Sequence, residues 1–491
     1  MRIFLGLLAC VSAAVSPALA QGPAIPVGTS LQPLIDNYLI QGFKGKAQFE
    51  LHSPVPREIV LVTNEPWEGN SCNYFTVFQD GPLYRMYYKA DEQVLKDEPP
   101  AHRTLACYAE STDGVHWTKP KLGLFEYEGS KDNNIIWDGE GAHDFSPFID
   151  SNPACPPEAR YKSVSHGKGG LTAFQSADGI HWGPLQDAPI ITDGAFDSDN
   201  VAFWDTLTGE YRVYFRAFRD GLRDIKTAVS KDFVTWSEAT WLEYPGAPKE
   251  QLYTNGVLPY FRAPQIYLGF PTRYIDRGWS ASSLALPEPE HRTKRYETSA
   301  REGSALTDGL FMTSRDGRTF HRWTETFIKP GLRTAGNWVY GDNYQCWGVV
   351  TTKAVMEEAP DELSVYATEG YWTGDDSRLR RFTLRMDGFV SVHAPMTGGE
   401  IMTRPIVFEG RNLALNFSTS AAGTIRIEIL DEAATPIEGF TLDDAPEIFG
   451  DNLNQVVTWK DGKDLLSLAG KPIRLRFVLN DADVYAFQFQ P

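Results

Sequence analysis

Acidic side chains stand just upstream of several short apolar stretches in this sequence. Three occupy this position: Asp144 before residues 145–149, Asp199 before residues 201–204, and Asp342 before residues 347–351. An aspartate before a strand is often a turn residue, but Asp144 and Asp199 hold one shared place in successive repeating units. Cleavage of a glycosidic bond needs a carboxylic acid that protonates the leaving oxygen and a second carboxylate that activates water or attacks the anomeric carbon. The recurring aspartates are candidates for that pair.

A seven-residue phrase marks the units that would position these carboxylates. It reads Ser-x-Asp-(Gly/Phe)-x-(His/Thr)-(Trp/Phe) and begins at Ser111, Ser176, Ser230 and Ser314. Asp-Gly favours the tight turn of a hairpin, and the aspartate can accept bonds from nearby amides. Four equivalent copies predict a structural role, outside the site, for Asp113, Asp178, Asp232 and Asp316. The copies start 65, 54 and 84 residues apart, and repeats at such intervals indicate a propeller or a solenoid.

Each unit contains about four short strands, and helical periodicity is nearly absent. We therefore predict an all-β chain with a five-bladed β-propeller over residues 67–395, the catalytic domain, whose fifth unit keeps the plan without the phrase. Residues 21–66 are an N-terminal lead-in, from which a strand within 48–62 closes the ring. The charged stretch Pro287 to Gly303 is expected to be a loop insertion in the fourth unit.

After Pro395 the pattern changes to short alternating strands separated by Gly, Asp and Asn. The expected strands cover residues 413–417, 424–430, 456–459, 473–479 and 484–489. About 95 residues of this kind predict a β-sandwich over 396–491. Packing against the propeller is its expected role, and carbohydrate binding is the alternative.

The first twenty residues have the features of a signal peptide. Met1-Arg2 precedes the apolar run Ile3 to Val15, and Ala18-Leu19-Ala20 precedes Gln21, which is the order of a cleaved export signal. Leu7-Leu8-Ala9-Cys10 is close to a lipobox, so a lipid anchor at Cys10 is the alternative. A periplasmic or secreted protein without a membrane-spanning segment is predicted.

The net charge and the cysteine content limit the classes of ligand, metal site and disulfide that the chain can have. The formal net charge is −18, so binding to nucleic acid or an anionic membrane is not expected. Neutral sugars, or acidic ones held by local arginines, remain candidates. Cys72, Cys107, Cys155 and Cys346 lack the close pairs of a zinc ribbon, which leaves three disulfide pairings and free thiols open. No cofactor is predicted, a structural calcium ion stays open, and the oligomeric state is not determined.

The phrases, the acidic turns and the C-terminal strands together resemble the five-bladed β-propeller glycoside hydrolases, which include families 32, 43, 62, 68 and 117. Three segments, residues 34–40, 123–127 and 384–390, are similar to exported bacterial proteins usually described as family-32-like or uncharacterised. Sialidases also carry an Asp-box on blade hairpins. Their box has one residue between Asp and Gly, whereas the two are adjacent here, so the sialidase alternative is disfavoured.

The resemblance implies a glycosidase with an Asp of the first blade as base or nucleophile, an Asp of the second as orienter, and a Glu of a later blade as acid. When this pattern is applied to the present sequence, the second blade supplies Asp144. Later blades supply Asp199, which has Asp197 beside it, and Asp342. The acid candidates are Glu302, Glu369 and Glu250. The first blade departs from the pattern, because Asn70 and Asn73 stand nearest the expected place, with Glu68 or Asp36 as substitutes.

Several side chains are candidates for substrate binding: His143, Asn255, Arg273 and Trp338. Arg216, Arg219 and Arg262 could join Arg273 in holding a uronate or sulfate, and Tyr253 is a candidate stacking platform. The predicted function is an exported glycoside hydrolase acting on a polysaccharide or oligosaccharide in the axial funnel. The alternative is a non-catalytic carbohydrate-binding or scaffold propeller. A sugar lyase, a third option, would need a Tyr or His base near an arginine cluster.

Overall fold

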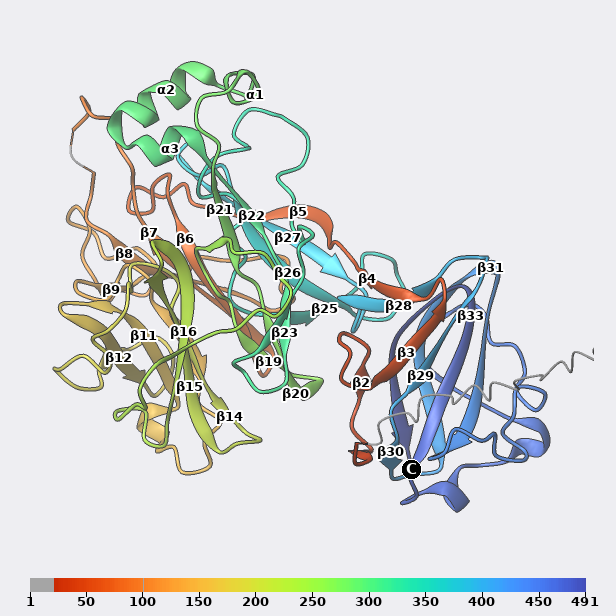
Figure 1. Ribbon diagram of the computed structural model, residues 1–491. Helices are drawn as coiled ribbons and strands as arrows, with labels where there is room; N and C mark the ends of the chain where they lie inside the picture. Colours follow the sequence, from red (N-terminus) through yellow and green to blue (C-terminus); the bar gives the residue numbers. More distant parts are fainter. Residues whose placement is uncertain (1–21, 100) are drawn as a thin grey trace, which may run out of the picture.

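The structure is a computed structural model that describes residues 22–99 and 101–491. The predicted signal peptide and Cys10 lie outside the described residues. Strands dominate the described chain, so the all-β prediction is confirmed. Figure 1 shows a group of small sheets on the left and one large sheet on the right. No described helix is long and apolar enough to cross a membrane.

Five four-stranded antiparallel sheets follow one another along the chain. Sheet 1 contains β6 (Asn73–Asp80), β7 (Leu83–Ala90), β8 (Leu105–Ser111) and β9 (Ile135–Asp138). Sheet 2 contains β10 (Ser146–Ile149), β11 (Tyr161–Gly167), β12 (Gly170–Ser176) and β13 (Gly183–Pro184). Sheet 3 contains β14 (Val201–Asp205), β15 (Glu210–Arg219), β16 (Leu222–Ser230) and β17 (Thr240–Trp241). Sheet 4 contains β19 (Leu258–Tyr260), β20 (Ala263–Gly269), β23 (Met312–Ser314) and β24 (Phe320–Arg322).

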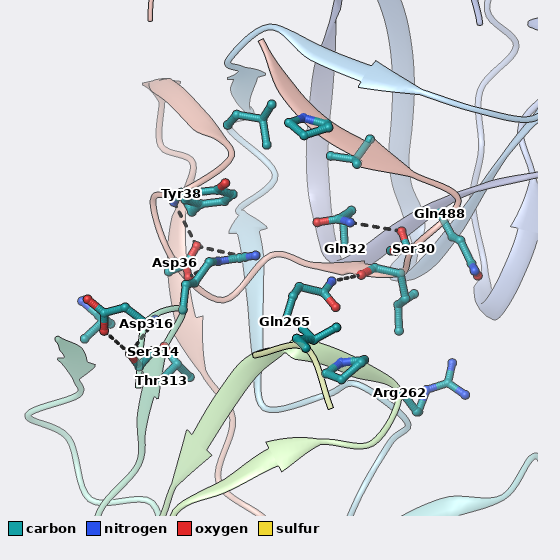
Figure 2. A pocket seen from close by; sticks show the side chains of 18 of the residues that line it. Ser30, Gln32, Asp36, Tyr38, Arg262, Gln265, Thr313, Ser314, Asp316 and Gln488 are labelled. Atoms are coloured by element: carbon teal, nitrogen blue, oxygen red, sulfur yellow. Dashed lines mark hydrogen bonds and ion pairs between the residues drawn. The ribbon is translucent and has the colours of Figure 1, made fainter. Parts of the chain in front are cut away.

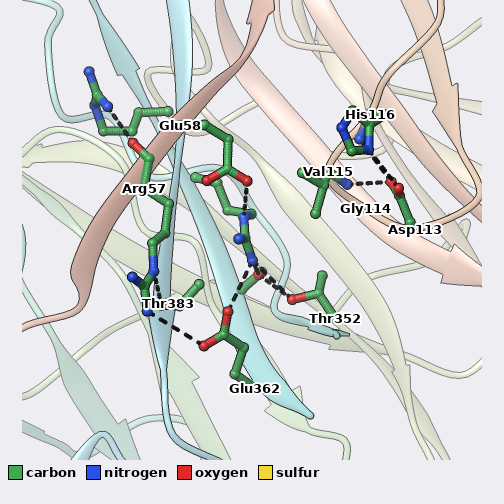
Figure 3. A network of polar contacts seen from close by, with 12 residues as sticks. Arg57, Glu58, Asp113, Gly114, Val115, His116, Thr352, Glu362 and Thr383 are labelled. Carbon is green, nitrogen blue, oxygen red and sulfur yellow. Dashed lines mark hydrogen bonds and ion pairs between the residues drawn. The ribbon is translucent and has the colours of Figure 1, made fainter. Parts of the chain in front are cut away.

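Sheet 5 combines strands from both ends of this region: β25 (Val350–Thr352), β26 (Glu362–Glu369), β27 (Arg378–Leu384) and β5 (Val55–Val62). Strand β5 pairs antiparallel with β27. Figure 3 shows the charged network that joins them. The buried Arg381 of β27 donates to Glu58 of β5 (2.9 Å) and to Glu362 of β26 (3.3 Å). This guanidinium therefore ties the N-terminal segment to the sheet that it completes.

The repeat phrase forms the hairpin that follows the third strand in sheets 1 to 4. In the first copy, Ser111 Oγ accepts from the Gly114 amide (2.9 Å), and Asp113 Oδ1 accepts from the amides of Val115 and His116 (2.8 Å each). The same bonds recur in the other three copies. The side chains of these four aspartates therefore stabilise the turns.

Three of these hairpins also join neighbouring sheets, because a tyrosine hydroxyl of one sheet donates to the phrase glycine carbonyl of the next. The pairs are Tyr87 with Gly179, Tyr214 with Gly317, and Tyr366 with Gly114. They connect sheet 1 with sheet 2, sheet 3 with sheet 4, and sheet 5 with sheet 1. The first and last sheets are therefore in contact.

Two further contacts complete this order. The third copy has Phe233 in place of glycine, at φ 67°, and its ring centre lies 5.6 Å from that of Phe148 in sheet 2. Sheet 5 packs against sheet 4 in one apolar cluster, which includes Val365 of β26 and Leu268 of β20. Asp387, in the turn after β27, also accepts hydrogen bonds from Tyr260 and from Arg262 (2.8 Å). The five sheets thus contact one another in a closed sequence.

The first strands of the sheets lie beside one another at the centre. β6 contacts both β10 and β25, and β10 contacts β14. A cavity of about 440 Å³ is lined by residues in and beside β6, β10, β19 and β25. Four of the five first strands therefore border a common space.

Ten strands form the large sheet: β1 (Ile25–Gly28), β2 (Gln32–Pro33), β3 (Ile40–Gly45), β4 (Gln48–Leu51), β28 (Val390–Ala394), β29 (Gly399–Thr403), β30 (Ile406–Phe408), β31 (Asn412–Asp431), β32 (Asp451–Val456) and β33 (Ile473–Gln490). The short strands expected over 413–430 and over 473–489 are one continuous strand each. The register of their pairing shifts between Thr419 and Thr424. Within residues 48–62, β4 pairs with β28 in this sheet, whereas β5 pairs in sheet 5.

The prediction of a loop over residues 287–303 is wrong. The segment contains α2 (Pro289–Thr298) and α3 (Ala300–Ser304), preceded by α1 (Ala281–Leu284), at one end of the small sheets (Figure 1). Helix α2 buries arginines instead of apolar side chains: Arg292 donates to the Trp338 carbonyl and Arg295 to the Tyr371 carbonyl. The sequence therefore lacks the apolar periodicity that signals a helix.

The remaining short elements complete the described chain. Strands β18 (Gln251–Leu252), β21 (Thr272–Asp276) and β22 (Ala305–Gly309) form a three-stranded sheet. Along the chain, β18 precedes sheet 4, and β21 and β22 lie between its strands β20 and β23. Short 3₁₀ helices occur at η1 (Pro157–Ala159), η2 (Lys460–Gly462) and η3 (Leu466–Leu468).

Candidate functional site

The turn before the first strand of each sheet is named here its leading turn, and the five leading turns meet. The ring of Tyr74, at the start of β6, lies 5.5 Å from that of His143, and Asn200 donates to Asp144. Ser198 Oγ donates to the Tyr253 carbonyl (2.6 Å). The ring of Tyr344 lies 5.4 Å from that of Tyr253 and 6.1 Å from that of Tyr74. Residues distant in sequence therefore converge at one end of the first strands.

Asp144, in the leading turn of sheet 2, is fully buried. Its Oδ1 accepts from Ser165 Oγ (3.0 Å) and from the His166 amide (2.9 Å), and its Oδ2 accepts from the Asn200 side-chain amide. Three donors suit a carboxylate that is ionised and acts only as an acceptor.

Asp199, in the leading turn of sheet 3, has a different environment. Its side chain is 3% exposed, Oδ1 lies 3.5 Å from Ser146 Oγ, and Oδ2 has no hydrogen-bond partner among the described residues. Burial first, and then the charge of Asp144, raise the pKa of Asp199 to about 7. Two adjacent carboxyl groups with unlike environments are the pattern of an acid and its charged partner.

This raised pKa predicts a pH-dependent stability. An unfolded aspartate ionises near pH 4, about 3.9 for a free side chain, whereas folded Asp199 keeps its proton until about pH 7. The stability that this carboxyl contributes is thus present below about pH 4 and is lost as the pH rises towards 7. We expect the wild-type protein to lose stability relative to Asp199→Asn over this range, measured by urea unfolding at fixed pH values. A constant difference from pH 4 to 7 would contradict the assigned protonation.

Two predicted substrate-binding residues lie beside this pair. Asn255 is buried and donates to the Asp199 backbone carbonyl (2.8 Å), so it positions the turn that carries Asp199. The His143 side chain is 36% exposed, and its Nδ1 lies 3.7 Å from Asp144 Oδ1. His143 therefore connects the buried carboxylate with the surface.

A layer of aromatic and arginine side chains adjoins the carboxyl pair. It contains Tyr74, Tyr253, Tyr340, Tyr344 and Tyr371, which pack as one cluster, together with Arg216 and Arg301. Of these residues, Tyr253 and Arg216 are candidates from the sequence, and the others are not. The available signal was a tyrosine two residues before a polar turn residue, as in Tyr253-Thr254-Asn255 and Tyr340-Gly341-Asp342.

Two further acids are buried near Arg295 of α2: Glu302, which lies on α3, and Asp342. Asp342 accepts from the Tyr371 amide (3.0 Å), and burial raises its pKa well above the ordinary value. Glu302 lies 3.2 Å from Arg301 and 3.5 Å from Arg295. Burial also raises the pKa of Glu302, against the charges of both arginines.

Other predicted site residues are engaged elsewhere. Glu68, in the turn before β6, is fully buried, and Lys119 (2.6 Å) and Tyr88 donate to it. Glu369 accepts two bonds from Arg380 of the adjacent strand, at 2.6 and 3.0 Å. Both acids are therefore neutralised by partners of their own sheets.

Arg273 and Trp338 are likewise held by local contacts. Arg273 donates to Asp308 (2.7 and 2.9 Å) and to Glu250 (2.9 Å). Trp338 donates from its indole nitrogen to the Gly331 carbonyl (3.0 Å). In these contacts, neither Arg273 nor Trp338 is bonded to Asp144 or Asp199.

Asp36, considered as a substitute in the first blade, lies in another place. It accepts from Arg315 (2.9 Å), over which the ring of Tyr38 stacks, and it lines a cavity of about 780 Å³ (Figure 2). This cavity lies between the N-terminal segment and sheet 4, with Gln265 and Gln488 also lining it. Asp36 is therefore paired at a site of its own.

No group of His, Cys, Asp and Glu within residues 22–99 and 101–491 is arranged to hold a metal ion. In the same residues Cys72, Cys107, Cys155 and Cys346 are free thiols. The disulfide alternatives left open by the sequence are thus not realised in the structure.

Comparison with known proteins gives only distant likenesses. No family model matches the chain, and no curated protein matches its sequence. A solved structure described as a glycoside hydrolase shares 14% identity at a TM-score of 0.43, covering 69% of this chain and 93% of the other. An endo-arabinase from Bacteroides thetaiotaomicron shares 9% identity at a TM-score of 0.38, covering 67% and 98%. An N-acetylgalactosamine deacetylase from F. plautii, in complex with blood group B trisaccharide, shares 12% at 0.40, covering 69% and 94%.

Proposed function

We propose that the protein is a glycoside hydrolase that cleaves a polysaccharide or oligosaccharide at the leading turns, with Asp199 as the general acid. The observation that carries the proposal is the unlike environment of two adjacent carboxyl groups. Asp144 accepts three hydrogen bonds, whereas Asp199 has an unpartnered oxygen and a pKa near 7. Perturbed carboxyl pairs of this kind are typical of acid–base sites.

The proposed reaction uses these groups in separate roles. Protonated Asp199 gives its proton to the glycosidic oxygen as the bond to the anomeric carbon breaks. Burial, and after it the charge of Asp144, keep that proton on Asp199 in the resting protein. Asp144 also orients His143, which lies 3.7 Å away and reaches the surface. His143 then activates the attacking water as a base oriented by a carboxylate. The neighbouring tyrosine rings offer faces on which a sugar can pack.

We also propose an architecture for the chain that carries this site. The closed order of five sheets supports a five-bladed β-propeller over residues 67–395, completed by β5 of the N-terminal segment, although β28 at the end of this range pairs in the large sheet. The two long strands β31 and β33 support a β-sandwich over residues 396–491, joined by strands of residues 25–51. Export by a signal peptide over residues 1–20, with a lipid anchor at Cys10 as the alternative, is part of the same proposal.

The test is a screen of the purified protein against a glycan panel, with release of new reducing ends as the readout. Release by the wild-type protein and its loss in both Asp144→Asn and Asp199→Asn are expected. Asp178→Asn, which alters a repeat hairpin, is the matched control and should retain activity. Full release by both site variants would refute the site. Binding of a glycan without any release would favour the non-catalytic alternative.

A further inference from the structure

We propose that the sugar bound at the leading turns carries an anionic group, a carboxylate or a sulfate ester, and that Arg216 recognises it. This inference rests on the proposed function and specifies its substrate class. It begins from Arg216 on β15, whose side chain is only 3% exposed. Its Nη2 pairs with Asp197, but its Nε and Nη1 have no partner among the described residues. Buried charged donors without acceptors are costly and call for a ligand.

The groups around Arg216 are mostly aromatic or cationic. The Arg216 guanidinium carbon lies 4.8 Å from the ring centre of Tyr253. Arg223 approaches the same ring at 5.3 Å and that of Tyr274 at 4.6 Å. Its Nη1 donates to the neutral Gln251, and its Nε has no partner among the described residues. Two adjoining arginines therefore retain unused donors beside one tyrosine.

The ion pairs of this region do not use all of its arginine donors. Arg301 lies 5.2 Å from the ring of Tyr340 and shares Glu302 with Arg295. Asp197 is the one carboxylate paired with Arg216, and its side chain is 56% exposed. Asp197 and Glu302 are thus the carboxylates that form ion pairs with Arg216, Arg295 and Arg301, and Arg223 forms none among the described residues. Asp342 also acts on Arg295 through its charge. Arginine donors that lack a carboxylate partner can attract an anion.

The charges of these arginines also act on Tyr253. Burial raises the pKa of Tyr253, but the guanidiniums of Arg216 and Arg301, with Tyr340, outweigh burial and hold it below the ordinary value. Burial keeps the pKa of the neighbouring Tyr74, Tyr340 and Tyr344 well above the ordinary value, so this effect is confined to Tyr253. A rim of exposed side chains, Asp197, His143 and Arg301, leaves the cluster next to solvent. Aromatic faces next to unpaired guanidiniums suit a charged sugar ring.

The test is calorimetric titration of full-length Asp199→Asn, in which the proposed cleavage is removed so that binding alone is measured. The ligands are trisaccharides of galacturonic and glucuronic acid, the matched galactose and glucose trisaccharides, and their sulfated forms. We expect at least one anionic trisaccharide to bind about 10-fold or more tightly than its neutral counterpart, because charged hydrogen bonds to Arg216 are formed only with the anion. Tighter binding of a uronic acid trisaccharide would identify the recognised anionic group as a carboxylate. Tighter binding of a sulfated trisaccharide would identify it as a sulfate ester.

Two substitutions decide whether Arg216 is responsible. Arg216→Gln in the same background should abolish the preference. Arg212→Gln is the matched control, because Arg212 lies on the same strand, carries the same charge and packs on Tyr267 away from this cluster. Equal affinity for anionic and neutral sugars, or equal loss in both variants, would overturn the inference. If the wild-type protein cleaves neutral glycans and shows no preference for anionic ones, the proposed function holds and this inference is wrong. If anionic sugars bind but no glycan is cleaved, this inference holds and the proposed function is wrong.

Discussion

Replacing Asp199 by asparagine should lower kcat for glycan cleavage by about 10²–10⁴-fold, the usual contribution of a positioned general acid. Asparagine keeps the size of the side chain but has no acidic proton to give to the leaving oxygen. Because the carboxyl already lies in a buried site with an unpartnered oxygen, the substitution should not destabilise the protein. The measurement is the initial rate of reducing-end release at pH 6, with folding verified by circular dichroism.

The leaving group separates this role from a structural one. A glycoside with an activated aryl leaving group needs little protonation, so Asp199→Asn should retain much more activity on it than on a natural glycan. An equal loss on both substrates would instead indicate distortion of the site. Asp144→Asn should reduce cleavage of both, because it removes the carboxylate that orients His143.

The second large effect is expected on stability. Arg381→Met removes the buried guanidinium that links β5, β26 and β27 (Figure 3). The substitution leaves Glu362, whose side chain is 13% exposed, without its main partner. Breaking a buried pair from one side costs about 3–5 kcal/mol, so the urea midpoint of unfolding should fall clearly.

Arg57→Met is the matched control for that substitution. Arg57 faces the same Glu362 at 3.8 Å, but its side chain is 32% exposed. A solvent-exposed pair contributes about 1 kcal/mol or less. Similar small losses in the two variants would show that the closure of sheet 5 does not depend on the buried charge.

The repeat phrase made the small sheets predictable. Its Asp-Gly turns require local hydrogen bonds that the sequence specifies, and Asp113 and its equivalents form them as expected. The helices α2 and α3 were missed because Arg292 and Arg295 take the buried positions where apolar residues usually signal a helix. The long strands β31 and β33 were divided because the polar residues between their halves, such as those near Thr419, look like turns in the sequence.

The site was only partly predictable for a related reason. Asp144 and Asp199 share a position in successive units, so their convergence follows from the repeat. Glu68 and Arg273 looked equally suitable, but each is neutralised by partners, Lys119 and Asp308, that become neighbours only after folding. Arg301 stands within an insertion that no repeat describes. Its place beside Tyr340 depends on helices that the pattern did not reveal.

Cleavage in water enriched in ¹⁸O tests the central claim most directly, with products of a susceptible glycan analysed by mass spectrometry. Hydrolysis at the carboxyl pair predicts one heavy oxygen at the new reducing end for the wild-type protein, and loss of that product in Asp199→Asn. A product that lacks water and contains a carbon–carbon double bond would show elimination instead. That result, or unchanged ¹⁸O incorporation by Asp199→Asn, would contradict hydrolysis by the pair Asp144 and Asp199.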